Sequence, residues 1–207
     1  MNKKAKTMLL SLGLVGVVGA GATLAYFSDE TATVNNTFTF GKGYGDNGLQ
    51  LKERKVVNNE GKWELDPTGG YDDDGKIEYD GLYPGQEVAK QPEIILDASV
   101  KSHVFVAINP NSKVTISDPD FSEKWTKAVV STDDGRDIYY YSEGGEEKLA
   151  KAQETITIFN SVKVDSSLNG DEELGDLNIQ VAAIQSDMSF NDALTQAKTM
   201  FDTPEGN

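Results

Sequence analysis

Short strand-forming runs separated by turn-rich segments constrain the fold of this chain more than any other feature. The breaks between the runs are built from Gly, Asp, Asn and Pro, as in GKGYGDNG, DPTGGYDDDGK and NGDEELGD. The β-rich runs are Thr37–Phe40, Leu49–Val57, Lys62–Leu65, Glu87–Leu96, His103–Asn109, Lys113–Ile116, Ile138–Tyr141, Glu154–Phe159 and Leu177–Ile184. Many short strands joined by polar turns predict an all-β fold, an antiparallel β-sandwich of the jelly-roll or immunoglobulin-like kind.

Two segments are predicted to be helical. Residues 190–201 place apolar side chains at helical spacing, and Ser189 or Asn191 could cap the helix that begins there. Residues 146–153, EEKLAKAQ, are rich in helix formers and predict a shorter helix. Because no repeat, linker or second boundary interrupts the pattern, residues 26–207 are predicted to form a single β-sandwich domain with a short C-terminal helix.

Composition excludes several classes of chemistry. The chain contains no cysteine, so it has no disulfide, thiol nucleophile or cysteine-based zinc site, and its single histidine excludes sites built from two histidines of one chain. The net charge is −15, and about −18 once three leader lysines are removed. Such acidity argues against nucleic-acid binding and favours solubility.

The first 25 residues have the layout of a secretory signal peptide. A basic start with three lysines precedes an uncharged, Gly-rich apolar run that ends in small residues. The run is just long enough for a membrane-spanning helix, but its glycines weaken a helix and no basic stop-transfer cluster follows. We therefore expect a cleaved signal peptide over residues 1–25 rather than a retained anchor. The small-residue rule permits cleavage after Ala22 or after Ala25.

Several stretches resemble the TasA/camelysin (CalY) family of secreted proteins of Gram-positive bacteria. They are LAYFSDE after the apolar run, NNTFTFGKG about ten residues on, the L-x-P-G element of Leu82, Pro84 and Gly85, and the late strand VAAIQ. The resemblance implies processing by a signal peptidase of the SipW type, with the cut at Ala25 or Tyr26. It also implies a protein that is secreted to the cell surface or extracellular matrix, and that meets the membrane only through its uncleaved signal peptide.

The same resemblance implies a structural function in a biofilm matrix. TasA forms extracellular fibres, and its mature N-terminal segment is thought to insert as a strand into the next subunit. Strand addition provides backbone hydrogen bonds, and alternate side chains fill pockets. The expected assembly residues are Tyr26, Phe27, Phe38 and Phe40, and the expected partner is another copy of the chain. Whether the freed strand folds back on its own sheet or joins a neighbour's stays open.

Two other functions remain as alternatives. Camelysin is classed as a metallopeptidase, but zinc catalysis needs about three protein ligands, and here His103 would have only carboxylates beside it. His103 lies in an alternating strand, which favours a partly buried histidine without a catalytic role and a protein that is not an enzyme. The second alternative is a monomeric surface-binding module, since binding loops on a sandwich leave no sequence motif.

The acidic turn at Asp72, Asp73 and Asp74 is a weak candidate for calcium. An EF-hand loop needs ligands at its first and twelfth positions, and alignment on Gly75 puts Gly70 and Gly81 there. The EF-hand pattern therefore fails, and only a weak Ca²⁺ site of clustered carboxylates is left. No other cofactor is expected.

Two further patterns carry structural expectations. The segment 81–108 predicts a hairpin in which Leu82, Pro84 and Gly85 form the opening turn, because Pro fixes one dihedral and Gly tolerates positive φ. The consecutive tyrosines 139–141 must point to alternate faces of a strand. We expect burial against the C-terminal helix rather than exposure at an interface.

Overall fold

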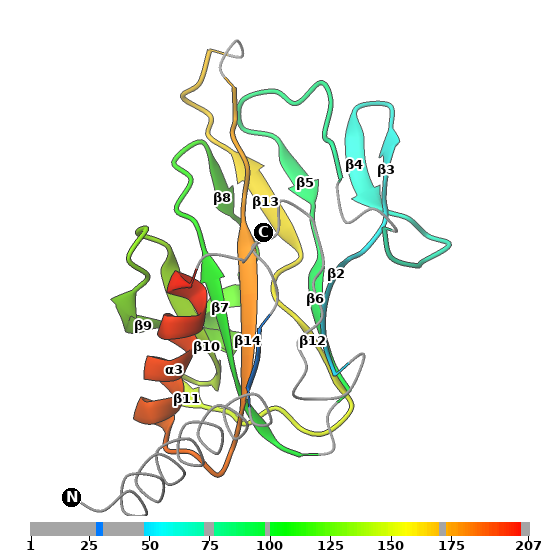
Figure 1. Ribbon diagram of the computed structural model, residues 1–207. Helices are drawn as coiled ribbons and strands as arrows, with labels where there is room; N and C mark the ends of the chain where they lie inside the picture. Colours follow the sequence, from blue (N-terminus) through cyan, green and yellow to red (C-terminus); the bar gives the residue numbers. More distant parts are fainter. Residues whose placement is uncertain (1–27, 31–47, 73–76, 98–99, 170–172, 204–207) are drawn as a thin grey trace, which may run out of the picture.

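The computed structural model describes residues 28–30, 48–72, 77–97, 100–169 and 173–203. Its fold is all-β, with antiparallel sheets packed as a sandwich and one longer helix near the C-terminal end (Figure 1). The predicted fold class is therefore confirmed. Within these residues, no helix has the length and apolar character that crossing a membrane requires.

The larger layer is a six-stranded sheet in the order β1-β14-β7-β10-β11, with β9 also paired to β10. Its strands are β1 (Ser28–Glu30), β7 (Ser102–Ile108), β9 (Trp125–Ser131), β10 (Asp137–Glu143), β11 (Glu146–Glu147) and β14 (Ile179–Gln185). β7 and β14 are paired over seven consecutive positions and form the centre of the sheet.

The opposing layer consists of two three-stranded sheets, β12-β6-β2 and β5-β13-β8. Its strands are β2 (Leu49–Glu53), β5 (Glu87–Ala89), β6 (Pro92–Leu96), β8 (Val114–Ile116), β12 (Glu154–Thr157) and β13 (Ser161–Val164). Two backbone bonds continue these pairings toward the point where the sheets meet: Lys90 N–H donates to Asn160 O at 3.1 Å beside the β5–β13 pair, and Ile158 N–H donates to Pro92 O at 2.9 Å beside the β12–β6 pair. A separate hairpin, β3 (Val56–Asn59) and β4 (Lys62–Leu65), projects from this layer (Figure 1).

The main hydrophobic core lies between the two layers. Trp125, Phe159 and Leu49 are among its largest fully buried side chains, and both layers contribute. From the larger layer, β7 contributes Val104, Val106 and Ile108, and β14 contributes Ile179, Val181 and Ala183. Burial of this apolar surface is the dominant favourable term in folding.

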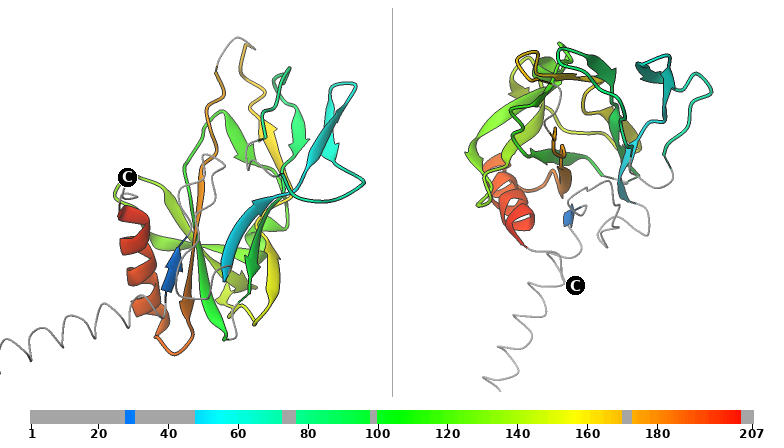
Figure 2. Two further views of the ribbon diagram at one scale, coloured as in Figure 1. Left: turned by 45° about the vertical axis from the view of Figure 1, so that its right-hand side comes forward. Right: turned by 90° about the horizontal axis from the view of Figure 1, so that it is seen from above.

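A second core lies on the outer face of the larger layer, under the helix α3 (Phe190–Asp202). Phe105 and Ala107 of β7 and Ala182 and Ile184 of β14 face this helix. The helix contributes four side chains of one face to this core: Ala193, Leu194, Ala197 and Phe201. The expected alternation along β7 is confirmed, but both of its faces are buried because α3 covers the side that would otherwise meet water (Figure 2).

The ends of α3 agree with the sequence prediction. Ser189 is the N-cap, and its hydroxyl accepts a hydrogen bond from the Asp192 N–H at 3.3 Å. The capping residue is thus Ser189 rather than Asn191. A second helix, α2 (Phe121–Lys124), is a single turn.

Three local predictions were wrong or incomplete. Residues 146–153 are not helical: Gly144 and Gly145, with φ of 64° and 87°, turn the chain so that β11 pairs back on β10. The run 87–96 is divided into β5 and β6, and neither strand pairs with β7, so the expected hairpin is absent. The strands β9 and β13 were not predicted.

The opening turn behaves as expected, and of the three tyrosines only Tyr140 packs against the C-terminal helix as expected. Gly85 has a φ of 82°, which suits glycine, and Gln86 N–H donates to Tyr83 O across the turn. Tyr140 points toward α3 and packs edge-on against Phe190, with ring centroids 5.0 Å apart. Tyr141 faces the main core on the other side of the strand.

Candidate functional site at the edge of strand β14

The candidate site is the outer edge of β14, the strand that carries the sequence VAAIQ. One edge of β14 is bonded to β7 along its whole length. The other edge pairs with β1, in the register Ser28 with Ile184, Asp29 with Ala183 and Glu30 with Ala182 (Figure 1). The N-terminal strand therefore folds back on its own sheet in this structure.

Strand β14 is apolar on both faces and needs such a cover. Val181 and Ala183 belong to the core between the layers, whereas Ala182 and Ile184 belong to the core under α3. An uncovered edge of this kind would present unpaired backbone N–H and C=O groups beside apolar side chains. A strand of another chain can pair with such an edge. β1 lies opposite three residues of the edge.

β1 is attached to the rest of the domain through a long connection. Residues 31–47 separate it from β2, which lies in the opposing layer. A strand at the end of such a connection can be supplied by its own chain or by a neighbour with the same backbone pairing. The geometry of the edge does not distinguish between the two sources.

The opposite edge of the same sheet is different. Both β9 and β11 pair with β10 there, and the pairing of β9, the longer of the two, shifts register between Asp137 and Tyr139. Val129 projects from this irregular part and is 99% exposed. Bulges at sheet edges hinder the addition of further strands. The two edges of the sheet therefore differ in their capacity to accept a strand.

A buried arginine fixes β14 to the neighbouring elements. Arg136 Nη1 donates to Gln180 Oε1 at 2.6 Å, and its Nη2 donates to the Phe201 carbonyl at 2.6 Å. Its Nε–H contacts the Asp134 carboxylate. Burial raises the pKa of Asp134, but hydrogen bonds from Thr132 and Arg136 outweigh it, so the pKa is lowered overall. The turn DDGRD gave no sign of this role, since its pattern only indicates a turn.

His103 lies one strand away from β1, opposite Ile184 of β14. Its Nδ1 contacts Glu147 of β11, and its Nε2 lies 3.0 Å from the Met188 carbonyl between β14 and α3. Both ring nitrogens thus face oxygen acceptors, and the side chain is buried. The histidine links three elements beside the edge.

The residues predicted to take part in assembly and processing lie outside the described part of the chain; they are Ala25, Tyr26, Phe27, Phe38 and Phe40. The signal segment 1–25 and the predicted strand at 37–40 lie outside it as well.

Most of the calcium candidate also lies outside the described residues. Of its three aspartates only Asp72 is described, and its N–H donates to the Glu53 carbonyl at 2.9 Å. In the part of the chain that can be described, no group of three His, Cys, Asp or Glu side chains is placed to hold a metal ion.

The fold and this edge define the protein as an all-β sandwich in which the N-terminal strand forms one edge of the larger sheet. Comparison with protein-family models and with curated proteins found no match to the chain.

Proposed function

We propose that this protein is a secreted structural subunit of the cell surface or biofilm matrix, which assembles into fibres by exchange of its N-terminal strand between copies. The observation that carries the proposal is the pairing of Ser28–Glu30 with the edge of β14. The resemblance of LAYFSDE and VAAIQ to the TasA/camelysin family supports it, since these two stretches contain the paired strands.

The mechanism follows from the backbone pairing. Cleavage of the leader after Ala25 or after Tyr26 would leave only two residues or one between the new N-terminus and β1, which would be free to leave its own edge. A strand from the next copy would then restore the same pairing, with Tyr26, Phe27, Phe38 and Phe40 as anchors. Because β9 is a poor acceptor edge, each copy accepts one strand and donates one. Such head-to-tail exchange gives an open filament.

Proline substitution in β1 tests this mechanism in the secreted chain that begins at Tyr26. Successive N–H groups of a strand point to opposite edges of that strand. The double variant Ser28→Pro with Glu30→Pro therefore removes hydrogen-bond donors from one edge of β1, and the single variant Asp29→Pro removes a donor from the other edge. We expect one of the two variants to stop filament formation and the other to allow it, as seen by electron microscopy and sedimentation.

A chain lacking residues 26–40 is the second test. It should remain monomeric while keeping the far-ultraviolet circular dichroism of a folded β-sandwich. Filaments from the truncated chain, or equal filament yields from both proline variants, would contradict strand exchange.

A monomeric surface-binding module is the alternative function. It is favoured by a cavity at the end of the sandwich near β5, β8 and β13. If the secreted chain stays monomeric at all concentrations, this second function becomes the better one.

A further inference from the structure

A cavity of about 480 Å³ opens at the end of the sandwich formed by β5, β8 and β13. Its wall is the apolar face of that sheet, with Val88, Val114, Val162 and Val164, together with leucines of two loop segments. The volume falls within the roughly 300–1,000 Å³ of small-molecule sites. Protein interiors leave few voids larger than a water molecule, so a space of this size is a distinct feature.

The first loop segment is held in place by polar contacts. Residues 173–178 are bonded to the loop after β7: Asn109 Nδ2 donates to Asp176 O, Asn111 Nδ2 to Leu174 O, and Lys113 Nζ to Glu173 O, at 2.6–3.0 Å. These bonds attach the segment to its neighbour rather than across the cavity. This wall of the cavity is therefore fixed to the loop that leads into β8.

The second loop segment, residues 77–82, is fixed by Tyr79. Its hydroxyl donates to the Ala89 carbonyl at 2.8 Å, and its ring packs edge-on against Trp63 with centroids 5.0 Å apart. Burial, with a smaller contribution from the charge of Glu53, raises the pKa of Tyr79 far above its usual value. Tyr79 therefore stays a neutral donor, and its hydrogen bond fixes this wall of the cavity to β5.

Lys90 is the one lysine among the residues that line the cavity, and its charge is already matched. It is 7% exposed, and its Nζ lies 2.8 Å from Oε2 of Glu53, which is 5% exposed. The other oxygen, Glu53 Oε1, is buried without a hydrogen-bond partner in the described structure. The Lys90–Glu53 pair is thus close to neutral overall, and the lysine that lines the cavity is not free to pair with an anionic ligand.

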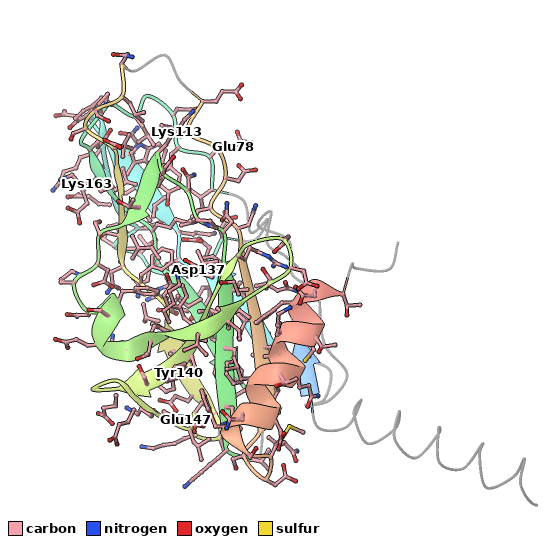
Figure 3. All side chains as sticks on the ribbon, turned by 90° about the vertical axis from the view of Figure 1, so that its left-hand side faces the viewer. Glu78, Lys113, Asp137, Tyr140, Glu147 and Lys163 are labelled. Carbon is pink, nitrogen blue, oxygen red and sulfur yellow. The ribbon has the colours of Figure 1, made fainter. Side chains whose placement is uncertain are left out.

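The outer lining has the opposite character. Glu78, Asp80 and Asp176 are exposed and contribute to the cavity lining, and Figure 3 shows Glu78 near the same end of the molecule as Lys113. Lys113 is not among the lining residues. Three carboxylates around an apolar space favour a positive charge at the mouth and disfavour a negative one.

We propose that this cavity binds an amphipathic small molecule with an apolar chain and a cationic amine head. The chain lies against the four valines of β5, β8 and β13, and the amine remains at the mouth beside the carboxylates. This function is independent of strand exchange, because the cavity and β1 involve different strands.

Titration of the secreted chain with octylamine, octanol and octanoate at pH 7 tests the proposal. The three probes share an eight-carbon chain and differ in head charge. Binding is followed by methyl NMR shifts of Val88, Val162 and Val164 and by the fluorescence of Trp63. We expect octylamine to bind most tightly, octanol less tightly and octanoate most weakly.

Two variants assign the contributions. Val162→Phe fills the cavity and should weaken octylamine and octanol at least tenfold; if it does not fold, Val114→Phe on the edge strand β8 serves the same purpose. Asp80→Asn with Asp176→Asn should weaken octylamine about two- to fivefold and leave octanol unchanged, as expected for exposed charges. Val129→Phe, on the remote strand β9, is the matched control and should change nothing.

Each other outcome overturns the proposal. Octanoate binding as tightly as octylamine would contradict the cationic head, and absence of binding up to the solubility limit of the probes would contradict the site. An octylamine isotherm unchanged by the cavity-filling variants would indicate adsorption to the acidic surface instead.

Discussion

The guanidinium of Arg136 donates a 2.6 Å hydrogen bond to the carbonyl of Phe201, and thereby joins the turn before β10 to the last turn of α3. The last carbonyls of a helix have no partner within the helix, and a cation there also complements the helix dipole. The same side chain bonds Gln180 of β14. One buried residue therefore fixes the helix, the turn and the strand whose outer edge pairs with β1.

Replacement of Arg136 by Met should lower the free energy of unfolding by about 2–4 kcal/mol, because it leaves Gln180 and the Phe201 carbonyl without their donor. Urea denaturation followed by circular dichroism measures the change. Lys127→Met is the control: Lys127 pairs with Asp137 but is largely exposed, so only a small loss of stability is expected. Equal losses in the two variants would contradict the assigned role.

Replacement of Lys90 by Met should be more costly, about 3–5 kcal/mol, because it leaves the Glu53 carboxylate buried without its partner. The double change Lys90→Met with Glu53→Met removes both charges and should recover most of the loss. Stabilities of the two single variants and the double variant form a thermodynamic cycle. A double variant as unstable as the sum of the single ones would show that the pair is not coupled.

Protonation of Glu87 should account for part of the stability that the protein loses at acid pH. Hydrogen bonds from Ser161 at 2.7 Å and Ser117 at 3.0 Å lower the pKa of Glu87 below its ordinary value of 4.5. A lowered carboxyl pKa adds stability that is complete above the unfolded value. That stability is lost as pH falls from 4.5 toward the folded value. Glu87→Gln should therefore flatten the acid limb of a stability–pH curve, with Asp97→Asn as a control; an unchanged limb would be contrary to this assignment.

Loss of the α3 cap should be measurable as well. Ser189→Ala removes the acceptor for the Asp192 N–H and should destabilise the protein by about 1 kcal/mol. Thr195→Ala changes an exposed threonine inside the same helix and should be neutral or slightly stabilising, because alanine is the better helix former. Thermal unfolding compares the two, and a larger loss at Thr195 would count against the capping role.

The pairing of Asp29 with Ala183 permits a direct test of where the strand goes. The chain has no cysteine, so a disulfide between Asp29→Cys and Ala183→Cys can only be the engineered one. Monomers should give an intramolecular bond, and filaments a ladder of covalent oligomers on a non-reducing gel. Asp29→Cys alone should give dimers at most; a filament without oligomer bands would contradict exchange in this register.

The sequence was informative where local signals decide the structure. The period of α3, the positive φ of Gly85 and the alternation of β7 all depend on residues close in the chain. The false helix at 146–153 shows the limit of such signals. Its residues favour a helix, but the Gly144–Gly145 turn and the pairing of Ser102 with Ala150 place them beside the sheet, and tertiary contacts overrode propensity.

The edge of β14 and the cavity are formed by residues that are far apart in the sequence, so they were harder to predict from sequence patterns. The partner of the N-terminal strand is some 150 residues away, and only the family resemblance pointed to an exchanged strand. Neither the Glu53–Lys90 pair nor the cavity leaves a motif, because each is created by loops and strands brought together from different parts of the chain.

The cover on both faces of β7 has a consequence for motion. Its amides lie between two packed layers and bonded neighbours, so their hydrogen exchange should require opening of the whole domain. β1 is joined to one neighbouring strand over three residues, and its amides should exchange through local opening. Local opening of this kind would release the N-terminal strand while the rest of the domain stays folded, so the proposed strand exchange would not have to wait for global unfolding.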